Sequence, residues 1–452
     1  MDNKLQTTLA LPTFAVAALA LLEDAGFESW CVGGFVRDSL MGRPTNDIDI
    51  ATPALWQQVR EVFEAAGYKT FETGIAHGTL TVAKDGELME VTTFRVDGTY
   101  SDRRHPDSVR FVSSIEEDLA RRDFTINAIA YHPRRGILDP YGGRSDIASA
   151  TIRTVGEASQ RFTEDPLRIL RGVRFASQLG FAIEEATFEA MSRQKELLDT
   201  VAVERIRLEL DGVLCGEHVL EVLLACIDII GQVIPELLPM KDFDQLNPHH
   251  IYDVLEHTAR CVAYVTPVPL NRWAALFHDL GKPRTFFTDD EGVGHFHGHP
   301  KHSVAIARSI MNRLKFPTAL KHDVLLLVEY HDRELGADPK AIKRMLLKLG
   351  GRVDLLYALT DLKRGDASAQ APQSAERVEL ALKIDEMLTS IVEDHQAFSL
   401  KDLAIDGSDV IALGVDAGPQ VGVLLERALD GVIEEKCAND RESLLEYLKQ
   451  AL

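Results

Sequence analysis

The sequence has 452 residues, of which 45% are hydrophobic and 26% charged, so we expect a globular protein with two to four domains. It contains no run of about 18 apolar residues, which excludes a helical membrane span, and its N-terminal stretch lacks the basic region of a signal peptide. Five scattered cysteines without C-x-x-C spacing exclude a disulfide framework or zinc ribbon and favour the reducing cytoplasm. A net charge of −21 argues against nucleic-acid binding over the whole surface.

The stretch Cys31–Thr52, CVGGFVRDSLMGRPTNDIDIAT, contains the first candidate metal ligands. It ends in an expected strand that carries Asp47 and Asp49. Because side chains alternate along a strand, the two carboxylates project from one face and the isoleucines beside them from the other. Neighbouring carboxylates repel each other unless a divalent cation lies between them. The pattern therefore indicates a metal site.

Candidate phosphate-binding groups lie just before that strand. Gly33 and Gly34 are expected to form a turn whose backbone a polyphosphate can approach closely. Arg37 follows, and its guanidinium has the geometry to hold phosphate oxygens in a bidentate manner. Together with the two aspartates, these residues favour a nucleotide site over an acidic solvent face.

Short elements follow in the next sixty residues. The periodicity predicts a helix over Leu55–Ala66 and strands over Gly78–Ala83 and Leu88–Phe94. Glu90, on the second of these strands, is a candidate third metal-side carboxylate, although a solvated side chain is the commoner case. The polar stretch Val96–Arg110, with glycine, proline and arginines, is expected to be a loop.

A second motif lies in Asp118–Tyr131, DLARRDFTINAIAY. Asp123 is expected to cap a helix that presents Asn127 one turn further on the same face, with Arg122 beside it. The stretch Asp139–Gly143, DPYGG, is expected to be a tight turn that closes the first domain.

A third group of polar residues lies in Thr163–Gly180, TEDPLRILRGVRFASQLG, which predicts a helix capped by its first residue and ended by its last. Four charged residues recur every third position, so they form one stripe along this helix. They are Asp165, Arg168, Arg171 and Arg174. Three arginines on one stripe repel each other unless an anion or a base edge faces them.

Arginine is concentrated in this part of the chain. Between Arg95 and Arg174 there are fourteen arginines against twelve acidic residues, and no lysine occurs from Asp85 to Gln194. The planar guanidinium suits phosphate and base-edge recognition, whereas lysine serves equally well for solubility. The segment is therefore expected to contact nucleotides in spite of the acidic overall charge.

Together these motifs resemble those of the nucleotidyltransferase superfamily, specifically the class II CCA-adding tRNA nucleotidyltransferases and their poly(A) polymerase relatives. The resemblance covers nearly the whole chain. It implies that Asp47 and Asp49 are catalytic and hold Mg²⁺ for two-metal phosphoryl transfer. It also implies a set of nucleotide-binding residues, namely Gly33, Gly34, Arg37, Arg122, Asp123, Asn127, Asp165, Arg168, Arg171 and Arg174.

Within that set the resemblance implies separate roles. The element with Arg122, Asp123 and Asn127 would bind the ribose and triphosphate. Asp165 and Arg168 would take the place of a template and pair with the edge of CTP or ATP, whereas Arg171 and Arg174 would hold phosphates and pack the neck.

Histidine is concentrated further along the chain, since ten of the fifteen histidines lie between His249 and His331. Imidazole nitrogens and carboxylate oxygens are common ligands for transition metals. Their order resembles an HD-type metal-dependent phosphohydrolase domain, which implies a site that holds Mn²⁺, Ni²⁺, Fe²⁺ or Zn²⁺. The implied ligands are His257, His278, Asp279, His299, His331 and Asp366. A Gly-His pair favours His299 over His297 and His302.

The expected fold class is α+β, with a mixed α/β nucleotidyltransferase head followed by all-α neck, HD and tail domains. The head is expected at residues 1–145 and a helical neck and body, for nucleotide selection and tRNA support, at 146–246. An HD metal-binding domain is expected at 247–370 and a helical tRNA-binding tail at 371–452.

The expected function is addition of CCA to the 3′ end of tRNA from CTP and ATP, with no membrane partner. A poly(A) polymerase or an A-adding enzyme shares the head motifs, but Thr73–Val82 and the Val96–Arg110 loop look like the CCA-adding branch. A second alternative is an HD-type phosphohydrolase with a non-catalytic head. The intact pair Asp47 and Asp49 argues against it, and against a non-catalytic RNA-binding module.

Overall fold

The computed structural model describes residues 9–45, 47–75, 78–97, 109–450 and 452. By its internal contacts the chain divides into two compact units. The first contains residues 1–218 and 226–233, and the second contains residues 219–225 and 234–452. Across the described ranges, no helix is both long enough and apolar enough to cross a bilayer.

A seven-stranded mixed sheet forms the centre of the first unit, in the order β3-β4-β5-β2-β1-β8-β9. Its strands are β1 (Trp30–Val32), β2 (Ile48–Thr52), β3 (Lys69–Gly74), β4 (Thr79–Lys84), β5 (Glu87–Thr93), β8 (Ala130–His132) and β9 (Gly136–Leu138). The middle strand β2 is antiparallel to β1 and parallel to β5. Its isoleucines Ile48 and Ile50 are buried, as the alternation predicted. The register with β5 places Asp49 opposite Glu90.

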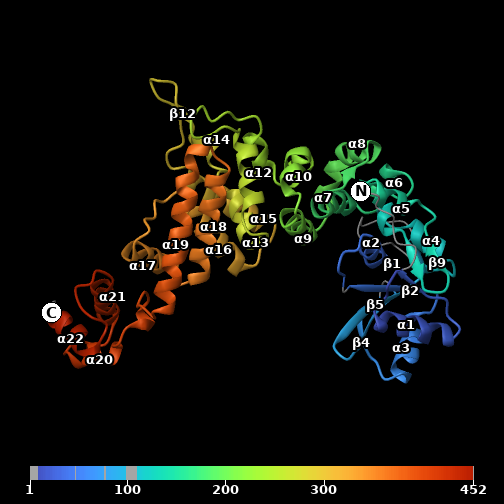
Figure 1. Cartoon of the computed structure of the whole chain (residues 1–452), viewed down its shortest axis with the longest axis horizontal. Helices are drawn as coiled ribbons and strands as arrows, with labels where there is room; N and C mark the ends of the chain where they lie inside the picture. The colour runs from blue at the N-terminus through green and yellow to red at the C-terminus, as the bar shows by residue number, and fades with distance from the viewer. Residues whose placement is uncertain (1–8, 46, 76–77, 98–108, 451) are drawn as a thin grey trace. The chain divides into compact units, whose positions relative to one another are not determined.

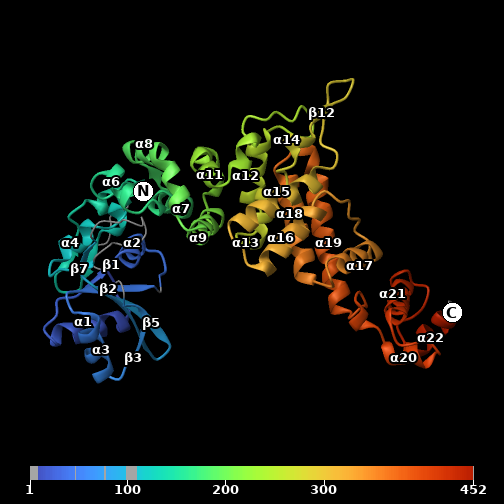
Figure 2. The same ribbon diagram turned by 180° about the vertical axis from the view of Figure 1, so that it is seen from behind.

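Helices α1 (Thr13–Asp24) and α3 (Trp56–Ala65) contact each other and the sheet (Figures 1 and 2). The helix expected over Leu55–Ala66 is confirmed by α3, whose buried Val59 and Phe63 face the core. Helix α2 (Gly34–Leu40) follows β1 directly and contacts both β1 and β2. The turn at Gly33 therefore lies beside β2, the strand that carries Asp49.

The predicted loop Val96–Arg110 begins and ends in paired strands. Strands β6 (Arg95–Asp97) and β7 (Val109–Phe111) run antiparallel, with Val96 opposite Arg110. Residues 98–108, which make up the rest of the loop, lie outside the described residues, as do residues 76–77 of the Thr73–Val82 segment.

The prediction that Asp123 caps an α-helix carrying Asn127 is wrong. Residues Thr125–Asn127 form only a 3-10 turn, η2. The reason is that the Asp123 backbone pairs elsewhere: its carbonyl, which in a helix would accept the first bond from the Asn127 amide, accepts from the Val155 amide at 3.1 Å instead. The two side chains nevertheless meet, because Asn127 Nδ2 donates to Asp123 Oδ1 at 3.1 Å.

The single helix predicted over Thr163–Gly180 is two helices. They are α6 (Ala158–Glu164) and α7 (Leu167–Leu179). Pro166 lacks an amide hydrogen and disfavours helical conformation in the residue before it, so the chain breaks at Asp165. Thr163 therefore lies in the last turn of α6 and caps nothing, whereas Gly180 ends α7 with φ of +71°, as expected. Asp165 precedes the helix that carries the three arginines.

Further short elements complete the first unit. They are α4 (Ile115–Ala120), α5 (Gly143–Ala148), β10 (Thr151–Ile152), β11 (Ala182–Ile183), α8 (Glu185–Gln194), α9 (Val203–Leu214) and α11 (Ile227–Val233). Helix α9 packs along α7. The charged face of α7 therefore has a helical neighbour within the same unit.

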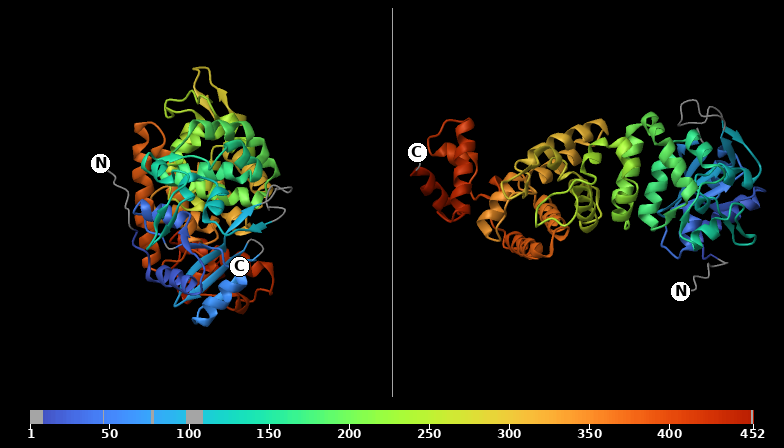
Figure 3. Two further views of the ribbon diagram at one scale, coloured as in Figure 1. Left: turned by 90° about the vertical axis from the view of Figure 1, so that its right-hand side faces the viewer. Right: turned by 90° about the horizontal axis from the view of Figure 1, so that it is seen from above.

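The second unit is helical apart from one short hairpin, β12 (Phe287–Thr288) and β13 (Gly294–His295). Its helices are α10 (Val219–Ala225), α12 (Val254–Tyr264), α13 (Pro269–Phe277), α14 (Lys282–Thr285), α15 (His299–Arg313), α16 (Thr318–Tyr330), α17 (Pro339–Lys348), α18 (Val353–Ser368), α19 (Ala375–Glu393), α20 (Gly407–Ala412), α21 (Pro419–Ile433) and α22 (Arg441–Lys449). Helices α12, α16 and α18 all contact α13 (Figure 3), and Trp273 and Phe277 of α13 are buried.

The last three helices have a small core of their own, in which Val410, Leu424 and Leu444 are buried together.

The predicted fold class is confirmed: a mixed α/β head precedes a helical remainder. The four-part division of the chain stays a prediction.

Candidate functional site

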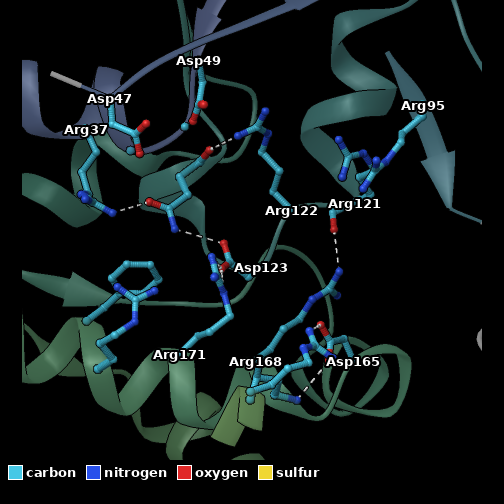
Figure 4. Close-up of a pocket in the computed structure, with 17 residues that line it drawn as sticks. Arg37, Asp47, Asp49, Arg95, Arg121, Arg122, Asp123, Asp165, Arg168 and Arg171 are labelled. Carbon is cyan, nitrogen blue, oxygen red and sulfur yellow. Dashed lines mark hydrogen bonds and ion pairs between the residues drawn. The ribbon is translucent and has the colours of Figure 1, made fainter. Parts of the chain in front are cut away.

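One cavity of about 560 Å³ in the first unit is lined by every residue predicted for nucleotidyl transfer (Figure 4). These residues are Gly33, Gly34, Arg37, Asp47, Asp49, Arg122, Asp123, Asn127, Asp165, Arg168, Arg171 and Arg174. They come from the β1–α2 turn and α2, from β2 and the residue before it, from η2 and the turn before it, and from α7 and the residues just before it. The fold therefore brings the separate motifs to one place.

The two aspartates lie side by side at one edge of this cavity (Figure 4). Asp47 immediately precedes β2, and Asp49 is the second residue of that strand. Burial raises the pKa of Asp49 to about 6; Arg122 opposes the rise, and the charges of Asp47 and Glu90 add to it. A cation between the carboxylates would relieve both the repulsion and the cost of burial.

Gly33 is required by the close packing around Asp49. Its φ is +73°, and a Cβ at this position would lie 2.8 Å from Arg122 Nη1 and 3.3 Å from Asp49 Oδ2. Any larger residue would therefore be strained and would also displace the guanidinium that faces the carboxylate.

Glu90 lies beside the aspartate pair but outside the cavity. Its position opposite Asp49 in adjacent parallel strands places both side chains on one face of the sheet. Glu90 is exposed and is not among the described residues that line the cavity. It contributes negative charge next to Asp49 in this structure, and its role as a third metal ligand stays a prediction.

A chain of hydrogen bonds crosses the middle of the cavity (Figure 4). Arg37 Nη1 donates to Asn127 Oδ1 at 2.7 Å, Asn127 Nδ2 donates to Asp123 Oδ1, and Arg171 Nε donates to Asp123 Oδ2 at 2.7 Å. Burial alone would raise the pKa of Asp123, but Arg171 and Asn127 hold it well below the usual range. Asp123 is thus a charged, acceptor-only group that fixes two donors.

The ring of Phe175 packs against three arginine side chains of the cavity. The guanidinium carbons of Arg37, Arg171 and Arg174 lie 5.1, 5.5 and 4.5 Å from the centre of its ring. Arg174 also donates to Glu209 of α9 at 2.6 Å. Acidic side chains of the same chain therefore neutralise these arginines. The sequence pattern had indicated only a bound anion or a base edge in this role.

At the other end of the cavity Asp165 and Arg168 are both held by other groups of the chain. Asp165 Oδ1 accepts from the Leu167 amide at 3.1 Å, and its Oδ2 accepts from Arg205 Nη2 at 3.1 Å. Arg168 Nη1 donates to Glu164 Oε2 at 2.9 Å, and its Nη2 donates to a backbone carbonyl at 3.0 Å. A carboxylate has further lone pairs and a guanidinium five N–H groups, so each retains capacity for a ligand.

A second group of functional candidates lies in the second unit. All six predicted HD residues are buried, and they form two triplets whose ligand atoms lie within 4.8 Å of one another. The first triplet is His257, His278 and Asp366, and the second is Asp279, His299 and His331. They are supplied by α12, α15 and α18 and by the residues that follow α13 and α16.

Asp279 belongs to the second triplet and also contacts the first. Its Oδ2 is 3.3 Å from His257 Nε2 and 3.1 Å from His278 Nε2. Its Oδ1 is 3.3 Å from His299 Nε2 and 4.0 Å from His331 Nε2. Burial alone would raise the pKa of Asp279, but His278 and Lys282 hold it well below the usual range, so the group is an anion.

The four histidines present the same ring nitrogen to this centre. Each Nδ1 lies within hydrogen-bond distance of a backbone carbonyl oxygen, namely that of Ala369, Ala275, Phe296 and Val328 for His257, His278, His299 and His331. Because a carbonyl only accepts, each Nδ1 carries a proton, so Nε2 is the nitrogen that a neutral ring presents to a metal ion. Two Nε2 pairs approach to 3.3 and 3.1 Å. Two neutral rings that face each other in this way would repel, and a cation between them would remove the repulsion; donation of Nδ1–H to a carbonyl is also the arrangement that metal-binding histidines adopt.

The two triplets open into a second cavity of about 450 Å³. Asp279, His299, His331 and Asp366 line it, together with the cations Lys282 and Arg377. Of the three neighbouring histidines weighed from the sequence, His299 joins the cluster. His297 lines the cavity with an exposed ring, and His302 is not among the residues that line it.

Comparison with known proteins agrees with the first cavity. Residues 29–153 match the poly A polymerase head domain, residues 180–239 a probable RNA and SrmB-binding site of polymerase A, and residues 295–448 a putative domain 2 of tRNA nucleotidyltransferase. The CCA-adding enzyme of Lactobacillus johnsonii is 32% identical over 447 residues, which covers 97% of this chain and 98% of the relative. The chain belongs to the CCA-adding enzyme family.

Two further members of the family are similar to this chain. The CCA-adding enzyme of Geobacillus thermodenitrificans is 42% identical over 271 residues, or 59% of this chain and 63% of the relative. The crystal structure of the Bacillus stearothermophilus CCA-adding enzyme in complex with CTP superposes with a TM-score of 0.72 at 30% identity, covering 98% of each chain. The similarity to known CCA-adding enzymes therefore extends over both compact units of this chain.

Several cavity residues were not predicted from the sequence. Phe175 and Arg205 line the cavity, as do Arg95 and Arg121. Arg121 precedes the predicted Arg122, and Arg95 begins the arginine-rich segment, so local composition carried a signal for these two. Phe175 directly follows Arg174, and no sequence pattern indicated that it lines the cavity. Arg205 lies on a different helix, 40 residues from Asp165, and no sequence pattern connects them.

Proposed function

We propose that the chain adds C, C and A to the 3′ end of tRNA, using CTP and ATP without a template. The proposal rests on the cavity in which Asp47 and Asp49 face nucleotide-binding groups that include Asp165 and Arg168. Family membership supports it, because the relatives over nearly the full length are CCA-adding enzymes and one was crystallised with CTP. A cytoplasmic location fits this activity, and the chain's five free cysteines suit a reducing compartment.

Membership of this nucleotidyltransferase family implies dependence on a divalent metal, and we assign Mg²⁺ to Asp47 and Asp49. The adjacent carboxylates fit a hard cation with oxygen ligands, and a cation would offset the burial and the neighbouring negative charges that raise the pKa of Asp49 to about 6. When bound, such ions supply activation of the tRNA 3′-hydroxyl and stabilisation of the leaving pyrophosphate. The chain itself orients the nucleotide: Arg37, Asn127, Asp123 and Arg171 form a connected, rigid set of groups beside the aspartates.

Nucleotide selection is assigned to Asp165 and Arg168. Cytosine and adenine share an exocyclic amino group next to a ring acceptor, which matches an acceptor-only carboxylate beside a donor-only guanidinium. Uracil and guanine present a carbonyl at that position and would face the carboxylate. Arg205 and the Leu167 amide hold the Asp165 carboxylate in place, so Arg205 is a positioning residue for selection.

Asp165→Ala is expected to lose discrimination against UTP and GTP more than it loses rate. An unpaired polar group costs about 1–3 kcal/mol, so the specificity ratio should fall by roughly 5- to 150-fold. Arg205→Ala should shift the ratio in the same direction by less, because the carboxylate remains but is no longer fixed. Arg207→Ala is the matched control, since Arg207 lies on the same helix but pairs with Asp211 outside the cavity. Steady-state kcat/KM for the four nucleotides gives the ratios; unchanged ratios in Asp165→Ala would exclude the assignment.

The activity itself is tested with tRNA that lacks its 3′ terminal nucleotides. Purified protein is incubated with this tRNA and labelled CTP, ATP or both, and the product ends are sequenced. The expected product ends in CCA and stops there. Runs of A would indicate a poly(A) polymerase, and addition of A only to tRNA that already ends in CC would indicate an A-adding enzyme.

A second function is supported by the buried histidine cluster. We assign to it metal-dependent hydrolysis of a phosphoester, with one ion held by each triplet and Asp279 in contact with both triplets. Imidazole and carboxylate donors suit Mn²⁺, Ni²⁺, Fe²⁺ or Zn²⁺. Lys282 and Arg377, which line the same cavity, provide positive charge for a phosphate. A 2′,3′-cyclic phosphate at an RNA end is a suitable first substrate to test.

A further inference from the structure

The hairpin formed by β12 and β13 displays a row of aromatic rings. Phe287 and His295 are directly opposite each other across the hairpin, and their rings stack with centres 5.3 Å apart and planes 28° from parallel. His297, two residues further on, continues the row: its ring centre is 5.6 Å from that of His295, with the planes at 21°. It is also 5.4 Å from Phe287. Three flat rings of the same surface therefore gather in one place.

The alternating residues of the hairpin face the other way and anchor it. Phe286 and Phe296 contact each other with ring centres 5.5 Å apart, and Phe286 also contacts Phe243 at 5.3 Å. Contacts among these partly buried rings hold the base of the hairpin. Two rings of the outer row are exposed, since 44% of Phe287 is accessible and His297 is exposed as well, whereas His295 between them is partly buried. An outward-facing aromatic row on an anchored hairpin is available to a ligand.

The outer row leads to the second cavity. His297 lines that cavity, and so does His299, two residues later, whose Nε2 belongs to the metal-ligand cluster. Phe296 lines it too, with Lys282 Nζ 5.1 Å from its ring centre. The aromatic row and the candidate metal centre are therefore continuous parts of one surface.

We propose that Phe287, His295 and His297 form a stacking platform for a nucleobase, so that the second cavity takes the phosphate of a nucleotide whose base lies on the platform. The proposal deepens the phosphohydrolase function proposed above and rests on it. Aromatic rings stack on any base at about 1–3 kcal/mol per base, without need of hydrogen-bond readout. The substrate class is thus a base-bearing phosphoester rather than a bare sugar phosphate.

The charges around the hairpin limit the ligand to one terminal nucleotide. The tip beyond the platform carries Asp289, Asp290 and Glu291, all exposed, and these repel a phosphate backbone. The cations Lys282 and Arg377 line the cavity instead. The phosphate is therefore attracted to the cavity and the uncharged base to the rings, whereas a strand running on across the tip is disfavoured.

The test compares a base-bearing phosphoester with one that lacks a base. Hydrolysis of a nucleoside 2′,3′-cyclic phosphate and of glycerol cyclic phosphate is measured on the full chain with Mn²⁺ or Ni²⁺. Phe287→Ala is expected to lower kcat/KM for the nucleotide about 5- to 150-fold, the range set by one stacked base, through KM, and to leave the base-free ester unchanged, since Phe287 is not among the described residues that line the cavity. His297→Ala should lower the nucleotide value as well. Phe287→Tyr retains a ring and should restore the nucleotide value. Tyr264→Ala is the matched control, because Tyr264 is 55% exposed in the same unit but does not line the cavity.

A binding measurement decides the proposal independently of hydrolysis. A 2-aminopurine nucleoside monophosphate is titrated into wild type and the variants, and any quenching at the first cavity is common to all of them, so the difference between wild type and Phe287→Ala reports the platform. Quenching of its fluorescence that is lost in Phe287→Ala but not in Tyr264→Ala supports the platform even if no ester is hydrolysed, in which case only the phosphohydrolase function fails. Equal quenching in all variants, or equal losses on both esters, overturns the platform and leaves the phosphohydrolase function standing.

Discussion

Replacing Asp47 or Asp49 with alanine is expected to abolish addition of CTP and ATP to tRNA. The two carboxylates line the cavity beside the nucleotide-binding groups, and they are the oxygen ligands available for Mg²⁺ there. Without the metal the hydroxyl nucleophile is not activated and the charge on the leaving pyrophosphate is not stabilised. Loss of one such electrostatic contribution costs about 10²–10³ in rate in other enzymes, and loss of a metal should cost at least that much. Single-turnover addition of labelled CTP measures it.

Controls separate chemistry from folding and binding. Asp47→Asn and Asp49→Asn keep the side-chain size and should be as inactive as the alanine variants, because an amide does not replace the charge. Asp24→Ala removes an exposed carboxylate of the same unit at the end of α1, outside the cavity, and should be fully active. Gel-shift titration with tRNA should show unchanged affinity in all of them. Turnover above a tenth of the wild-type rate in either alanine variant contradicts the two-metal assignment.

The sequence predicted the aspartate pair well because its geometry depends on local structure only. A strand imposes period two on its side chains, so Asp47 and Asp49 share a face wherever that strand lies in the fold. The apolar Ile48 and Ile50 are buried on the opposite side and fix which face this is. The Gly33 turn was predictable for the same reason, since positive φ is a local property.

The partners of the arginines could not be predicted, because they depend on contacts between distant elements. Arg171 pairs with Asp123, 48 positions earlier, and Arg174 pairs with Glu209 on a neighbouring helix. Composition showed an excess of arginine but not that acids of the chain neutralise it. The same limit explains the helix wrongly predicted at Asp123, where pairing of its neighbours with residues 153–155 overrides local capping.

The histidine cluster could be predicted from the sequence only in part. The density of histidines and the HD pair were visible in the sequence, but the division into two triplets was not, since Asp366 lies more than 80 positions after Asp279. Which of the neighbours His297 and His299 joins the cluster depends on the start of α15 at His299. That start turns the His299 Nδ1 towards the Phe296 carbonyl and its Nε2 towards Asp279.

Combining His278→Ala with Asp279→Ala is expected to remove metal binding and phosphoester hydrolysis together while leaving CCA addition intact. The double variant removes one ligand of the first triplet and the carboxylate of the second triplet that also contacts the first. The first cavity is lined by other residues altogether, so its chemistry should be unaffected. Metal content of the purified chain is measured after loading with Mn²⁺ or Ni²⁺, and hydrolysis is measured on a panel of phosphoesters that includes 2′,3′-cyclic phosphates.

Single variants test whether each triplet holds its own ion. Wild-type protein should bind two metal ions per chain, and His257→Ala and His331→Ala, one from each triplet, should each reduce this number towards one. His322→Ala is the matched control, because 68% of the His322 side chain is exposed and it lies outside both triplets. Circular dichroism confirms that each variant is folded, since an unpaired carboxylate left in a buried site is destabilising. A wild-type chain that binds no transition metal and hydrolyses no ester would show that the cluster has only a structural role. The two triplets are the groups of described residues that could hold a metal ion. Hydrolysis that survives in the double variant would therefore contradict the assignment of the activity to this cluster.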